Sequence, residues 1–152
     1  MAVMLRVSLF AVLLVAQSFT GCLDSFRKAI PTGAEETALA AFEGSWTSIA
    51  ASTAQQSCTD FTWTITDVSA SGVSGEWGAR CFGTVPVAGT ATGTLDDGTI
   101  RWAATGTGSV EETGACAVAL TGSAYRDNAQ IRIPYSGTTC LGAVSGTEIL
   151  RK

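Results

Sequence analysis

Five cysteines and the absence of histidine decide which chemistry this chain can carry. Cysteine serves as a nucleophile, a metal ligand or half of a disulfide. Without histidine, neither a Ser-His-Asp nor a Cys-His arrangement can form within the chain. Zinc sites usually join closely spaced cysteines, often with histidine, whereas these stand far apart, at Cys22, Cys58, Cys81, Cys116 and Cys140. We therefore expect no enzymatic activity, no metal and no cofactor.

An apolar segment precedes the first cysteine. Residues 7–16 form an apolar run that contains one polar residue, Ser8, and Arg6 is the only charge among the first 23 residues. The run has the length of a signal-peptide core and is shorter than the ~20 residues that a membrane-spanning helix needs. The sequence therefore predicts a signal peptide over residues 1–21.

The end of this segment, Phe19-Thr20-Gly21-Cys22, resembles the lipobox of bacterial lipoproteins, with Phe19 where leucine is usual. The resemblance implies cleavage before Cys22, attachment of lipid such as palmitate to its sulfur, and a tether over residues 22–33. The protein would then be exported and anchored in the cell envelope through its lipid. No aspartate directly follows Cys22, which implies the outer membrane where a cell has two. The alternative is ordinary secretion after cleavage at Ser18, giving a secreted or periplasmic protein.

The charge balance is acidic, with a net charge of −4. Loss of residues 1–21 would remove only Arg6 and leave 8 basic and 13 acidic residues, a net charge of −5. Phosphate contacts require Lys and Arg, so this balance argues against nucleic acid as a partner. It also argues against electrostatic attachment to anionic headgroups, so the expected membrane contact is the lipid itself.

The four cysteines of the body form two pairs of similar spacing. Cys58 and Cys81 are centred next to Ala70, and Cys116 and Cys140 are centred on Asn128. Each midpoint falls at a turn signal, so each pair can face across the open end of a hairpin. Four cysteines allow three pairings, and we predict the local one, Cys58–Cys81 with Cys116–Cys140.

The body has the pattern of an all-β domain over residues 34–152. Residues 61–66 alternate threonine with large apolar side chains, as a half-buried strand does. Asp97-Gly98 and Asp127-Asn128 are turn dipeptides. The spacing predicts an antiparallel meander barrel of about eight strands, with a sandwich as the alternative. The expected strands cover 45–50, 61–66, 73–82, 89–95, 100–104, 117–125, 130–136 and 143–151.

Three local features refine this fold. Thr32 and Glu35 have capping-box spacing, which predicts a short helix over residues 34–42. Pro134 lies inside an expected strand, which favours an edge or bulged strand there. A symmetric first hairpin places Trp77 opposite Thr62, so either a bulge shifts the register or Trp77 points outward.

Four tryptophans are the remaining candidates for function. Gly44-Ser45-Trp46 at the start of the first strand resembles the opening of lipocalin-type (calycin) barrels. That resemblance implies that Trp46 closes one barrel end against Arg151 of the last strand. The chain is also similar to small lipid-anchored inhibitor barrels of bacteria. Core packing is the ordinary role of strand tryptophans. Contact with a ligand or partner is the alternative role for Trp63, Trp77 and Trp102. Of these three, we expect Trp77 to be the exposed one.

Three functions therefore remain open from the sequence. The chain can be a non-catalytic protein-binding module, such as an inhibitor of an extracellular enzyme, or a structural surface lipoprotein. It can also be a lipocalin-like carrier of a small apolar ligand, which would require a cavity of roughly 300 Å³ or more.

Overall fold

The computed structural model describes residues 33–50, 57–111 and 114–152. The predicted signal peptide, the lipidation of Cys22, nearly all of the tether and the Thr32 cap lie outside the described residues. The expected helix is present as α1 (Gly33–Ala40). It leads directly into the first strand.

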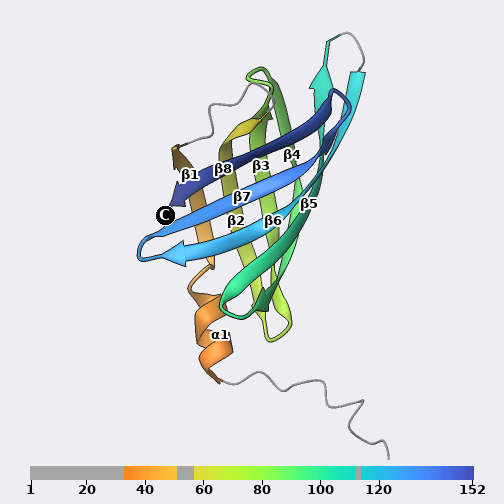
Figure 1. The fold of residues 1–152 in the computed structure, drawn as a ribbon. Helices are drawn as coiled ribbons and strands as arrows, with labels where there is room; N and C mark the ends of the chain where they lie inside the picture. Colours follow the sequence, from red (N-terminus) through yellow and green to blue (C-terminus); the bar gives the residue numbers. More distant parts are fainter. Residues whose placement is uncertain (1–32, 51–56, 112–113) are drawn as a thin grey trace, which may run out of the picture.

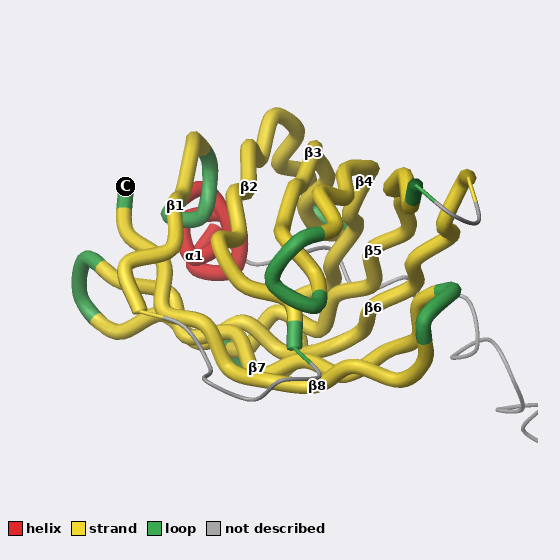
Figure 2. Tube along the Cα trace, turned by 90° about the horizontal axis from the view of Figure 1, so that it is seen from above, coloured by secondary structure: helices red, strands yellow, loops and turns green. Residues whose placement is uncertain are grey.

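The predicted all-β meander barrel is confirmed, and the sandwich alternative is wrong (Figures 1 and 2). Eight strands follow one another in chain order, each antiparallel to its neighbours, and β8 closes the ring on β1. The strands are β1 (Gly44–Ala50), β2 (Cys58–Ser69), β3 (Gly72–Cys81), β4 (Val85–Asp96), β5 (Thr99–Val110), β6 (Gly114–Asp127), β7 (Gln130–Thr139) and β8 (Gly142–Arg151).

The turns have the backbone geometry that their residues favour. Asp97 and Gly98 both have positive φ values, 48° and 74°, as the central pair of a type I′ hairpin turn requires. Asn128 also has a positive φ of 54° at the turn between β6 and β7. Asparagine and aspartate tolerate this conformation better than other residues with a Cβ. These local preferences fix where each hairpin reverses.

The register of the first hairpin shifts twice on β2, between Thr59 and Thr62 and between Ile65 and Asp67, and the first of these bulges decides the place of Trp77. Cys58 pairs with Cys81, but Trp63 pairs with Trp77, so β2 carries one extra residue between them. Asp60, inside this bulge, has a positive φ of 55°. The extra residue moves Trp77 from opposite Thr62 to opposite Trp63, on the inner face of the barrel.

Both disulfides are formed as predicted, Cys58–Cys81 and Cys116–Cys140. The Cα atoms are 3.8 Å apart in the first pair and 5.1 Å apart in the second. In an up-and-down barrel, consecutive turns alternate between the two ends. Each disulfide joins the two strands of one hairpin at the end of the barrel that lies away from that hairpin's turn, and the two turns lie at the same end. The two disulfides therefore lie at one end of the barrel, and α1 lies at the other (Figure 1).

The expectation of an edge or bulged strand at Pro134 is wrong. The ring has no edge, since β7 pairs with both β6 and β8. The pairing of β7 with β8 runs through Pro134 without a shift, while the pairs of β6 and β7 are interrupted at Pro134 and at its neighbour Ile133. Proline lacks the N–H that a ladder uses, and the barrel accommodates this by omitting pairs on one side.

The interior is filled by large side chains that pack over glycines. A Cβ on Gly106 would lie 3.1 Å from the Trp77 ring and 2.4 Å from the carbonyl oxygen of Ala88. A Cβ on Gly122 would lie 2.9 Å from the Trp102 ring. Since protein interiors are close-packed, glycine on one strand makes the space that tryptophan on another strand fills. This accounts for part of the high glycine content.

Candidate functional site

The tryptophans predicted as contact candidates form part of the core. Trp63, Trp77 and Trp102 are all buried, so the expected exposure of Trp77 is wrong. The indole N–H of Trp77 donates to the carbonyl oxygen of Thr105 at 3.1 Å. The rings of Trp63 and Trp102 meet edge to face with centroids 5.0 Å apart. None of the three indoles is available to a partner without rearrangement of the barrel.

The space beside these tryptophans is too small for an organic ligand. The cavity lined by Trp63, Trp102, Ile65 and Ile100 has a volume of about 20 Å³. A carrier site needs roughly 300 Å³ or more. The indole N–H groups of Trp63 and Trp102 have no hydrogen-bond acceptor among the described residues. A small-molecule carrier would therefore have to displace its own core side chains.

The barrel end near α1 is closed around Trp46. This side chain is buried, and its indole N–H donates to the carbonyl oxygen of Phe42 at 2.7 Å. The ammonium group of Lys152 lies 5.0 Å from the centre of the Trp46 ring, a cation–π contact. The predicted partner, Arg151, is instead exposed. Leu150 points inward, so Arg151 points outward and Lys152 is the next residue that can reach the ring.

A hydrogen-bonded clamp holds the opposite end. The Tyr135 hydroxyl donates to the carbonyl oxygen of Cys58 at 2.5 Å and accepts from the N–H of the same residue at 2.7 Å. The pKa of Tyr135 is raised to about 12, chiefly by burial; the hydrogen bonds to Cys58 and Ser57 oppose the rise, and the charge of nearby Glu148 adds to it. Glu148 is itself buried and accepts a hydrogen bond from Ser48. The clamp therefore fixes the strand that carries the first disulfide.

Alkaline pH is expected to weaken this clamp. The folded protein raises the pKa of Tyr135 above the ordinary tyrosine value of about 10. The stabilisation that the protonated Tyr135 hydroxyl gives the folded state is therefore complete below about pH 10 and is lost as the pH rises through about 12.

Urea unfolding across this range should show a free energy of unfolding that falls as the pH rises. Tyr135→Phe is the control: it should be less stable by about 1–3 kcal/mol at neutral pH, because two buried backbone groups lose their partner, and its stability should fall less steeply above pH 10. Equal slopes would contradict the assignment.

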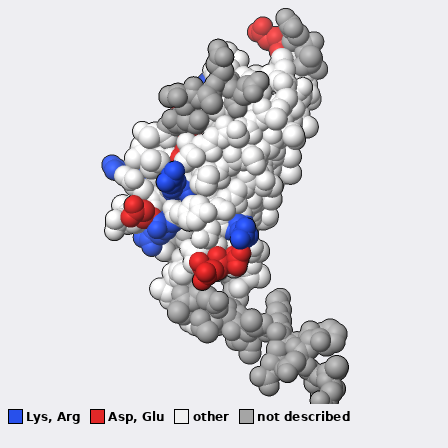
Figure 3. All heavy atoms as spheres, in the orientation of Figure 1, with Lys and Arg blue, Asp and Glu red and all other residues white. Residues whose placement is uncertain are grey.

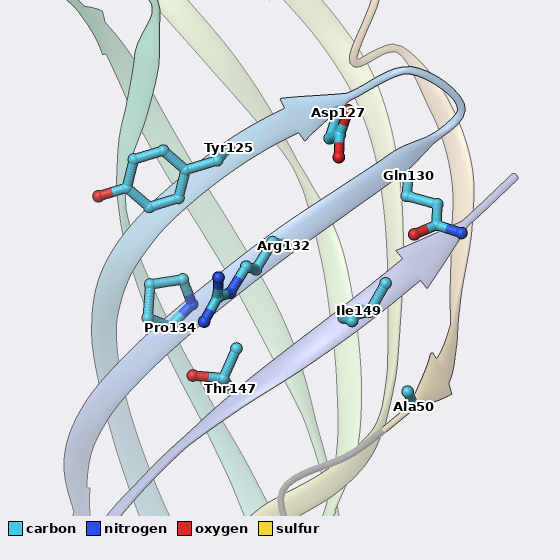
Figure 4. A pocket seen from close by; sticks show the side chains of 8 residues that line it. All are labelled: Ala50, Tyr125, Asp127, Gln130, Arg132, Pro134, Thr147 and Ile149. Atoms are coloured by element: carbon cyan, nitrogen blue, oxygen red, sulfur yellow. The ribbon is translucent and has the colours of Figure 1, made fainter.

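A row of aromatic, basic and apolar side chains crosses four strands on the outside of the barrel. Tyr125 pairs with Arg132, Arg132 with Ile149, and Ile149 with Ala50. We call the surface around this row the β6–β8 face. It forms a hollow of about 750 Å³ that is open to solvent (Figure 4). The hollow is lined by Ala50, Tyr125, Asp127, Gln130, Arg132, Pro134, Thr147 and Ile149.

This face carries exposed side chains that a partner can recognise. Tyr125 is 47% exposed, and Ile49, at the bulge where β1 meets β8, is 50% exposed. Figure 3 shows basic side chains over the ends of β6, β7 and β8 with acidic side chains beside them, while uncharged atoms cover most of the rest of that view. Sequence reasoning did not single out this face. The available signal was the β6–β7 turn, which places Tyr125 and Arg132 opposite each other.

The described residues contain no group of three or more His, Cys, Asp and Glu side chains that is placed to hold a metal ion. They also include no helix that is long and apolar enough to span a bilayer. Comparison of the chain with protein-family models, with curated proteins and with solved structures finds no match. The site must therefore be interpreted from its own geometry.

Proposed function

We propose that this chain is a lipid-anchored, non-catalytic protein-binding module of the bacterial cell envelope. The β6–β8 face is the observation that carries the proposal, because it combines an exposed tyrosine, arginines and apolar side chains on one rigid surface. Tyrosine and arginine are enriched among the residues that dominate protein–protein binding energy. Inhibition of an extracellular enzyme is one form that such binding can take.

The filled and stapled barrel supports this proposal over a carrier. Closed strands and two disulfides keep the β6–β8 face in one shape, so little conformational entropy is lost when a partner binds. Disulfides persist in oxidising compartments, which agrees with export. The eleven residue-to-residue steps from Cys22 to Gly33 can span at most about 40 Å. A lipid on Cys22 would hold the α1 end within that distance of the membrane.

Anchoring can be tested by the mass of the protein purified from membranes. We expect a chain of residues 22–152 with acyl chains and two disulfides, and we expect Cys22→Ser to leave the membrane fraction. A mature chain that begins at Phe19 without acyl groups would instead establish ordinary secretion.

Binding can be tested by photo-crosslinking in cells that produce the full chain. A photoreactive amino acid in place of Tyr125 is expected to give a discrete protein adduct. The matched control is the same group in place of Thr90, an exposed residue on β4, across the ring from β8. The proposal fails if position 125 gives no adduct, or gives the same adducts as position 90.

A further inference from the structure

We infer that the β6–β8 face binds an acidic segment of a protein partner, with carboxylates at Arg132 and Arg151 and an apolar side chain between Tyr125 and Ile149. This inference rests on the proposed protein-binding function and adds the chemistry of the partner.

The local charge of this face is opposite to that of the whole chain. Arg132 pairs with Ile149 and Arg151 with Gln130, so the two arginines are diagonal neighbours on the outer surface, within about 8 Å. Asp127 is the one acidic side chain that lines the hollow, so the two arginines leave the face with a net positive charge. The chain as a whole has a net charge of −4. An acidic partner is therefore attracted here and repelled elsewhere, which orients it.

The arginines of this face have no acidic partner within the described part of the chain. The ion pairs there are Arg80–Asp60, near the other end of the barrel, and Arg101–Asp96, which lies on β4 and β5 beside Tyr125. Arg132 and Arg151 thus keep their guanidinium donors for an external group. Guanidinium binds carboxylate with two parallel hydrogen bonds, which gives both energy and orientation.

The apolar part of the face favours a protein segment over a simple anion. Pro134 and Ile149 lie on either side of Arg132 in the hollow, and Ala50 lies beyond Ile149 (Figure 4). Ile49, which precedes Ala50, is exposed. These side chains gain nothing from a bare polyanion, whereas an aliphatic or aromatic side chain of a partner would bury them. Figure 4 shows Tyr125 on one side of Arg132 and Ile149 on the other.

The same end of the barrel disfavours an anionic membrane as the occupant. The β4–β5 turn, with Asp96 and Asp97, and Glu43 after α1 lie at the end where the β6–β7 turn lies. A flat anionic surface that reached Arg126 and Arg132 would also meet these carboxylates. A peptide segment in the hollow avoids them.

The test uses synthetic peptides with the protein carrying Cys22→Ser, which leaves every other residue in place. The probes are three twelve-residue peptides that repeat Glu-Leu-Glu-Ser, Gln-Leu-Gln-Ser or Lys-Leu-Lys-Ser. Amide chemical shifts are followed by NMR during each titration. We expect the Glu peptide alone to shift the amides of Tyr125, Arg132 and Ile149, with weaker binding at higher salt. We expect Arg132→Glu to weaken this binding at least tenfold.

Arg80→Glu is the matched control, because it makes the same charge change at an exposed residue near the opposite end of the barrel. It should leave the affinity unchanged. A fourth peptide, Glu-Ser-Glu-Ser, tests the apolar contact and should bind more weakly than Glu-Leu-Glu-Ser. Thermal melts establish that both variants remain folded.

Several results would overturn the inference. These are equal binding of the Glu and Lys peptides, no effect of Arg132→Glu, or shifts confined to another face. Sedimentation of the Cys22→Ser protein with phosphatidylglycerol-containing vesicles, lost in Arg132→Glu, would assign the face to lipid instead. An adduct at position 125 without Glu-peptide binding would leave the protein-binding function standing and reject the acidic partner. Absence of both would reject the two proposals together.

Discussion

Replacement of both Cys58 and Cys81 by alanine is expected to lower the free energy of unfolding by about 3.4 kcal/mol through the loss of loop-closure entropy alone. The pair closes a loop with a sequence separation of 23. Both cysteines are also buried in the core, so deletion of their sulfur atoms leaves a cavity and adds to the loss. Urea unfolding of the oxidised protein and of the double variant measures the difference.

The second disulfide provides the matched control. Cys116–Cys140 has nearly the same separation, 24, so its loop-closure contribution is nearly equal. Cys140, however, is exposed in the turn after β7. The Cys116→Ala, Cys140→Ala variant should therefore lose less stability than the first variant, by about 1 kcal/mol. A greater loss at Cys116–Cys140 would contradict the packing described for the first pair.

The Tyr135 clamp should be coupled to the first disulfide. Because Tyr135 holds the backbone of Cys58, loss of the disulfide and Tyr135→Phe affect the same strand end. Residues in direct contact show non-additive effects on stability. We expect Tyr135→Phe to be non-additive with the Cys58–Cys81 variant and additive with the Cys116–Cys140 variant.

The disulfides were predictable because pairing followed from local symmetry. Each cysteine pair is centred on a turn signal, and hairpins bring residues that are equidistant from a turn together. The strand order was predictable for a similar reason, because segments of alternating apolar and polar residues are separated by turn dipeptides along the chain. No long-range information was needed for either result.

Features that depend on one residue of register were not predictable. The bulge at Asp60 relies on a left-handed conformation that the sequence does not mark, and it decides that Trp77 points inward. The contact of Lys152 rather than Arg151 with Trp46 depends on the same kind of single-residue step at the end of β8. One step of register exchanges the inner and outer faces of a strand.

Prediction of the β6–β8 face would have required the pairing registers of four strands at the same time. Tyr125, Arg132, Ile149 and Ala50 come from separate strands, and their row exists only because the ring closes between β8 and β1. The bulge that exposes Ile49 lies at this closure. A sequence pattern shows which residues point outward on one strand, but lateral neighbours across a closed ring follow only from the complete set of registers.

Trp102→Ala is expected to cost about 3–5 kcal/mol of stability and to create a binding cavity that the native barrel lacks. The indole of Trp102 packs against Trp63 and over Gly122, and the existing cavity beside it is only about 20 Å³. Removal of the indole would join this space to a void on the order of 150 Å³, a size that binds small aromatic molecules in other apolar cores. Closed strands cannot collapse far to fill it.

Thermal melts with and without added indole measure this effect. Indole should raise the melting temperature of the Trp102→Ala variant, because a ligand that binds only the folded state stabilises it by mass action. It should leave the native protein unchanged, since the native interior has no room for it. Trp46→Ala is the comparison, because its void would open at the barrel end beside Lys152 and retain indole less well. A rise in the native protein would show an accessible interior and would favour a carrier over a binding module.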